Sequence, residues 1–140
     1  MNVRKVWMFD PHAGGRKISP TVQDAVRNRI LEHAAKDYAG KYSRIEVRFR
    51  GPFCYIDAFL EPWVGKRHRT ESLGESRSDY IKRMRSTPIH LCRLRHFDID
   101  RWSLAFYAYS HERYEPCVFP NGDWLGTPEE GFDVGAIYLL

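Results

Sequence analysis

The sequence lacks the long apolar run that a membrane-spanning helix needs. Nowhere in its 140 residues do roughly 18 apolar residues follow one another, the length that crosses a bilayer. The N-terminal segment MNVRKVWMFDPHAGG has only a short apolar stretch, with no small-residue cleavage site after it, so it does not match a signal peptide. We therefore predict a cytoplasmic protein with no membrane partner.

Cysteine is also scarce. Cys54, Cys92 and Cys117 form an odd set with no CxxC pair, which favours a reducing compartment and buried thiols that act as small apolar side chains. Strict alternation places Cys92 on one strand face with His90 and His96, but those histidines would lie about 20 Å apart, too far for one ion. We predict no metal site and no cofactor, and no motif assigns a catalytic residue.

Alternation of apolar and polar side chains is the strongest positive signal. Residues 44–60 read RIEVRFRGPFCYIDAFL, two alternating runs on either side of Gly51-Pro52, which is typical of a hairpin. Residues 90–97 and 102–110 form a second pair of such runs. Residues 114–119 are predicted to form an edge strand, because Pro116 cannot donate to a central ladder.

Helical patterns flank these strands. A helix is predicted from Ser19 or Thr21 to Gly40, a short one over residues 79–85, and a terminal one beginning at Thr127-Pro128. Apolar residues at Phe132, Ala136 and Ile137 are expected to face the core, while Gly131 and Gly135 weaken the terminal helix. The order predicts an α+β fold, an antiparallel sheet of about five strands with an N-terminal and a C-terminal helix packed on one face. We expect an arm over residues 1–18 and a single α+β domain over residues 19–140, with a basic excursion at 61–88.

Alternation also divides the side chains between the two sheet faces. One face is predicted to collect Cys54, Ile56, Ala58 and Leu60, with either Cys92 and Leu94 or Leu91 and Phe97. A slip of one residue would invert a strand. The opposite face is predicted to collect Arg48, Arg50, Tyr55, Asp57, Arg93, Arg95, Tyr107 and Tyr109.

Arginine and tyrosine on one surface suit single-stranded nucleic acid, particularly RNA. Guanidinium groups bind phosphates, and flat rings stack on unpaired bases. Residues 62–95 carry nine Lys or Arg against three acids, a local charge of +6, whereas residues 111–140 carry a local charge of −5. The basic excursion adds the candidate phosphate contacts Lys66, Arg67, Arg69, Lys82, Arg83 and Arg85.

Three other interpretations stay open. Arg48 or Arg93 is equally suited to an ordinary wet sheet surface, paired with Glu46 or Asp57 across strands. The aromatic residues suit either completion of the core or a protein-interaction module, such as an inhibitor or accessory subunit. A metal-independent ribonuclease of toxin type is the third, with Arg93, Arg95, Tyr107, Tyr109 and His111 as its candidates. The partner-binding candidates are Trp7, Phe9, Trp63 and Trp124.

Four segments resemble a group of small bacterial proteins without assigned function. They read RFRGPFCYIDAF, HLCRLRHF, WSLAFYAYSHERYEP and GTPEEGFDVGAIYL, within residues 44–140. The resemblance implies a single intact module in a bacterial setting, and no activity or site residue. We expect a small non-enzymatic binding protein that contacts nucleic acid or belongs to a nucleoprotein assembly. No pattern indicates its oligomeric state.

Overall fold

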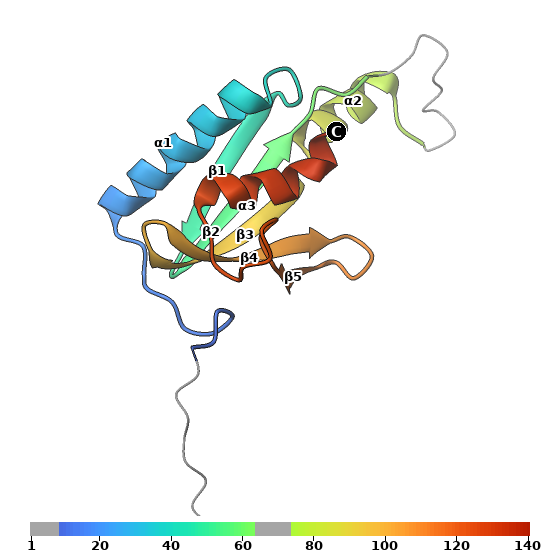
Figure 1. The fold of residues 1–140 in the computed structure, drawn as a ribbon. Coiled ribbons are helices and arrows are strands. Elements are labelled where there is room, and N and C mark those ends of the chain that lie inside the picture. The colour runs from blue at the N-terminus through green and yellow to red at the C-terminus, as the bar shows by residue number, and fades with distance from the viewer. Residues whose placement is uncertain (1–8, 64–73) are drawn as a thin grey trace, which may run out of the picture.

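The computed structural model describes residues 9–63 and 74–140, which form a five-stranded antiparallel sheet with two helices on one face (Figure 1). The strands follow one another in chain order across the sheet, and the predicted α+β class is confirmed. The elements are α1 (Pro20–Asp37), β1 (Arg44–Arg50), β2 (Phe53–Phe59), α2 (Arg77–Ser86), β3 (Ile89–Asp98), β4 (Arg101–Ala108), β5 (Arg113–Cys117), α3 (Pro128–Gly135) and the 3-10 helix η2 (Ala136–Leu139).

The hairpin predicted from alternation is β1–β2. Its register pairs Val47 with Ile56 and places both in the core, as the two-residue period requires. The turn between the strands depends on Gly51, whose φ of 57° lies in the left-handed region that glycine adopts at little cost. The two-residue alternation along β1 and β2 therefore fixes which face of the hairpin is buried.

The core lies between the inner face of the sheet and the apolar stripes of α1 and α3. Val26, Ile30 and Ala34 recur at four-residue steps along α1, and all three are fully buried. Phe132 of α3 packs into the same core. The sheet contributes residues from four strands: Ile45, Val47, Cys54, Ile56, Cys92, Leu94, Trp102 and Leu104.

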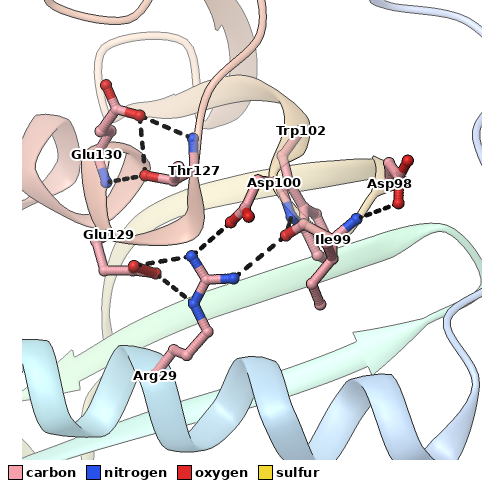
Figure 2. A network of polar contacts seen from close by, with 8 residues as sticks. All are labelled: Arg29, Asp98, Ile99, Asp100, Trp102, Thr127, Glu129 and Glu130. Atoms are coloured by element: carbon pink, nitrogen blue, oxygen red, sulfur yellow. Dashed lines mark hydrogen bonds and ion pairs between the residues drawn. The ribbon is translucent and has the colours of Figure 1, made fainter.

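Local signals fix the helix ends, with some departures from the predictions. Ser19 caps α1, and α2 begins two residues before the predicted start, with Ser76 as its cap. Thr127 and Glu130 form a capping box at the start of α3, as predicted (Figure 2). Ile137 is 61% exposed, so its predicted core position is wrong, because the chain tightens from α3 into η2 just before it.

Two glycines in α3 permit its close approach to the sheet. A Cβ atom on Gly131 would lie 2.6 Å from Leu94 Cδ2, and one on Gly135 would lie 2.6 Å from the carbonyl oxygen of Leu91. The interpretation of these glycines as helix weakeners misses that role, since their lack of a side chain lets the helix backbone rest on β3.

A polar network joins α1 to α3 and to the β3–β4 turn (Figure 2). The guanidinium of Arg29 donates two parallel hydrogen bonds of 2.9 Å to the carboxylate of Glu129. Its Nη2 also lies 2.7 Å from Asp100 Oδ1, and its Nη1 donates to the carbonyl of Ile99. Because a bidentate pair fixes direction as well as distance, Arg29 sets how the two helices lie on the sheet.

In the part of the chain that the structure describes, no helix combines the length and apolarity needed to cross a bilayer.

Candidate nucleic-acid interface on the outer face

We call the side of the sheet opposite α1 and α3 the outer face. The strand registers place cross-strand neighbours on it together, for example Tyr55 beside Arg48 and Arg93. The division predicted from alternation holds in this region, with Cys92 and Leu94 on the inner face. The residues of the outer face are Arg44, Glu46, Arg48, Arg50, Phe53, Tyr55, Asp57, Phe59, His90, Arg93, Arg95, Ser103, Ala105, Tyr107, Tyr114 and Pro116.

A buried carboxylate lies at the centre of the outer face. Asp57 is only 3% exposed, and each of its oxygens has a partner. Arg48 Nη2 donates to Oδ2 at 2.9 Å, and His90 Nδ1 lies 2.8 Å from Oδ1. The predicted alternative pairing of Arg48 with Asp57 is therefore present, and it occupies Nη2 of one candidate phosphate contact.

His90 reaches the outer face because β3 contains a bulge. The register steps from Ile56 opposite Cys92 to Asp57 opposite His90, which leaves Leu91 as an extra residue. An extra residue reverses the alternation on one side of it. The prediction that His90 shares a face with Cys92 and His96 is thus wrong, and sequence reasoning missed the Asp57–His90 pair because a bulge has no signature in the alternation itself.

A cluster of rings surrounds this pair, with Tyr114 of β5 at its centre. The Tyr114 ring lies 5.1 Å from Tyr107, 5.6 Å from Tyr55 and 6.3 Å from His90 between centroids. Its hydroxyl is buried without a hydrogen-bond partner in the described residues, and burial, followed by the nearby charge of Asp57, raises the pKa of Tyr114. Sequence reasoning did not select Tyr114, although its ring contacts Tyr55, Tyr107 and His90 together.

Tyr109 follows β4 and completes the ring cluster. Its hydroxyl accepts a 2.8 Å hydrogen bond from the backbone N–H of His90, and its ring lies 4.7 Å from Tyr107. Burial is the main cause that raises the pKa of Tyr109. Both predicted tyrosines of the β4 region therefore contribute to one ring cluster.

Two arginines of the outer face are held by rings instead of carboxylates. The guanidinium carbon of Arg93 lies 4.5 Å from the Phe53 centroid and 5.4 Å from that of Tyr114, and Arg95 lies 4.7 Å from Phe53. Neither makes an ion pair with a described carboxylate. Desolvation and the neighbouring charge of Arg93 lower the pKa of Arg95, and the charge of Asp10 opposes that shift.

The segment preceding α1 crosses the β3–β4 end of the outer face. Arg95 Nη1 donates to the carbonyl of Gly14 at 3.0 Å, and His12 lies beside Ser103 and Ala105, which are both buried. The Phe9 and Phe97 rings lie 5.0 Å apart. This part of the face is covered, so the accessible part is the region of β1, β2 and β3 around Arg48, Arg50 and Arg93.

The basic candidates outside the sheet have different positions. Lys66, Arg67 and Arg69 lie outside the described residues. On α2, Arg83 pairs with Glu75 and Arg85 pairs with Glu61, while Lys82 is exposed. Arg85 and Lys82 also line a pocket of about 310 Å³ with Arg44 and Phe59, so α2 adjoins the end of the outer face.

Of the aromatic partner candidates that the structure describes, Phe9 and Trp124 come together and Trp63 lies apart from their pocket. Trp63 is 90% exposed, and Trp124 and Phe9 line a pocket of about 480 Å³ with Asp100 and Arg101. Trp7 lies outside the described residues. Core completion is wrong for Trp63 and Trp124, which are both exposed, whereas Trp102 is fully buried in the core.

The predicted ribonuclease set is not assembled as expected. His111 lies in the β4–β5 turn and bonds Glu115 at 2.6 Å. Arg93 and Arg95 instead lie opposite Ala105 and Ser103, which are nearer the start of β4 and away from that turn.

The cysteines are free thiols in strands, and burial raises the pKa of Cys54 and of Cys92. Within residues 9–63 and 74–140, no three His, Cys, Asp or Glu side chains converge as a metal-binding group.

The chain matches no protein-family model, no curated protein and no solved structure with which it was compared.

Proposed function

We propose that the outer face binds single-stranded nucleic acid, with RNA as the preferred polymer. The proposal rests mainly on Arg93, which is held in place by ring stacking and has no direct ion pair among the described residues. Arg95 lies beside it at the border of the covered part, stacked on Phe53, with one of its donors bonded to Gly14. A guanidinium that is positioned but not neutralised keeps its hydrogen-bond donors available for a phosphate oxygen.

The charge balance of the face supports the same conclusion. The outer face carries five arginines against two carboxylates, Glu46 and Asp57, and Asp57 is buried. A phosphate backbone approaching this surface therefore meets an excess of positive charge. Tyr55, Tyr107 and exposed Tyr109 supply rings beside those charges, which is the combination that stacks bases without strict sequence preference.

The test is the salt dependence of binding to a single-stranded RNA, measured by fluorescence anisotropy. The double variant Arg93→Ala with Arg95→Ala should weaken binding by at least about tenfold. Because each phosphate contact contributes roughly −0.7 to the log–log salt slope for single strands, loss of two contacts should flatten the slope by about 1.4.

Lys36→Ala with Lys41→Ala is the matched control. It removes the same charge from two exposed positions outside the strands, one on α1 and one in the connection between α1 and β1. Affinity and slope should stay close to those of the unmodified protein. Equal losses in both double variants, or no binding to RNA at low salt, would refute the proposed interface.

A protein partner is the second proposal, supported by the exposure of Trp63 and by the pocket that Phe9 and Trp124 line. Large exposed aromatic side chains are typical anchors of protein interfaces. A complex of this kind would depend weakly on salt and would be lost on Trp124→Ala, whereas Arg93→Ala would leave it unchanged.

A further inference from the structure

The Asp57–His90 pair has the geometry of an oriented general base. His90 Nδ1 faces the carboxylate at 2.8 Å, and its Nε2, on the other side of the ring, makes no hydrogen bond with a described residue. The His90 side chain is 30% exposed, so Nε2 is accessible to solvent. A neutral imidazole held in this way donates from Nδ1 to Asp57 and leaves Nε2 as an acceptor for a substrate proton.

Surrounding contacts fix the ring in that orientation. The Tyr107 ring packs 4.8 Å from the His90 ring, and the Tyr109 hydroxyl holds the His90 backbone. Asp57 is too deeply buried to contact a substrate, which makes it a positioning residue that acts through His90. The bulge at Leu91 is what directs the imidazole to this face, and bulges often redirect a side chain beside a functional site.

The same carboxylate also places a cation next to the base. Arg48 bonds Oδ2 of Asp57 while His90 bonds Oδ1, so the guanidinium and the imidazole are held on either side of one carboxylate. The Arg48 side chain is about half exposed; its Nε lies 3.9 Å from Glu46 Oε1, and its Nη1 makes no ion pair with a described carboxylate, so Nη1 is the donor available to a ligand. A phosphate lying over Asp57 would therefore meet a positive charge and a proton acceptor together.

We propose that the outer face cleaves single-stranded RNA, with His90 as the general base. The inference rests on the proposed function, since the strand must first bind there, and it goes beyond the non-enzymatic role expected from the sequence. The nucleophile is the 2′-hydroxyl of the bound ribose, which needs only a base beside it and a cation on the phosphate.

The reaction is a transesterification. His90 Nε2 takes the 2′-hydroxyl proton as the 2′ oxygen attacks the adjacent phosphorus, and the bond from phosphorus to the 5′ oxygen breaks. The 5′ oxygen takes a proton from water, and the imidazolium returns its proton to the hydroxide that remains. The products are a 2′,3′-cyclic phosphate and a 5′-hydroxyl, and Arg48 stabilises the charge that develops on the phosphate oxygens.

The experiment measures binding and cleavage on the same protein preparations. An end-labelled single-stranded RNA is incubated with the protein in the presence of a chelator, and the new ends are identified chemically. We expect 2′,3′-cyclic phosphate ends from RNA, while a 2′-O-methyl RNA of the same sequence is bound but not cleaved.

His90→Ala should reduce the cleavage rate by about 10²-fold or more, the usual contribution of a general base, and leave binding within about twofold. Added imidazole should restore part of the rate, an effect that a merely structural role would not show. His111→Ala is the matched control, because His111 also bonds a carboxylate through Nδ1 but lies in the β4–β5 turn. Its rate should be unchanged.

The outcomes separate the two proposals. RNA that is bound and remains intact overturns the cleavage proposal and leaves the binding proposal standing. RNA that is neither bound nor cleaved refutes both. Cleavage that persists at the full rate in His90→Ala also overturns the role of His90 as the base.

Discussion

Asp57 connects three strands through its two oxygens. It belongs to β2, and its partners Arg48 and His90 belong to β1 and β3. A buried carboxylate without partners is costly, so both contacts are needed for the charged form to be accommodated. Asp57 thus links β1, β2 and β3 on the outer face, and the same contacts orient the His90 ring.

Gly135 offers a test of close packing at the level of one atom. Gly135→Ala places a Cβ atom 2.6 Å from the Leu91 carbonyl oxygen, which is backbone and cannot move independently of β3. The strain should exceed the gain of roughly 1 kcal/mol in helix propensity and lower the free energy of unfolding by about 1–3 kcal/mol, measured by urea denaturation.

Gly131→Ala is the natural comparison on the same helix. Its Cβ atom would meet Leu94 Cδ2, the end of a side chain that can change rotamer. Its loss of stability should therefore be the smaller of the two. A larger loss for Gly131→Ala would contradict the distinction between backbone and side-chain contacts.

At the level of elements, alternation predicted the hairpins and the division of most side chains between the faces. It succeeded for Val47, Ile56 and Arg93 because one sheet face is buried, which ties register to hydrophobicity. It failed at His90, where one extra residue in β3 reverses the pattern. The site pair was therefore inaccessible to sequence reasoning, since the bulge depends on how β3 pairs with β2.

The helices show a similar division between local and tertiary causes. Thr127 and Glu130 predicted the start of α3 because a cap involves neighbouring residues only. The roles of Gly131 and Gly135 depend on the approach of α3 to β3, which no local pattern records. Arg29 was also missed, because its partners lie about 70 to 100 residues away in the chain.

The Arg29 network predicts how firmly α1 and α3 are joined. Arg29→Ala removes the bidentate bonds to Glu129 and the contact with Asp100, and should lower the free energy of unfolding by about 1–2 kcal/mol. Thermal or urea unfolding measures the loss, which should shrink at high salt because these charges are partly exposed.

Arg113→Ala serves as the control for Arg29→Ala. Arg113 is well exposed and makes one weak contact of 3.4 Å with Glu115, so its removal should change stability by less than about 0.5 kcal/mol. Equal effects of the two substitutions would show that the geometry of the Arg29 contacts adds nothing.

At the scale of the described molecule, the acids of α3 and most arginines of the strands lie on opposite sides of the sheet. The acids Glu129 and Asp133 of α3 pair with Arg29 and His33 of α1, so these two acids join the helices to each other. The arginines at positions 48, 50, 93 and 95 lie on the outer face. Glu129 and Asp133 are therefore separated in space from Arg50 and Arg93, which lie on the uncovered part of the sheet and make no ion pair with a described carboxylate.

This separation predicts that the location of a charge matters more than the total charge. Arg50→Glu and Lys36→Glu both change the net charge from +4 to +2, but Arg50 is on the outer face and Lys36 is exposed on α1. Arg50→Glu should weaken RNA binding by about tenfold or more, and Lys36→Glu by less than about threefold, measured side by side at one salt concentration. Equal losses would mean that RNA binding depends on the net charge of the protein, and would contradict the outer face as the binding surface.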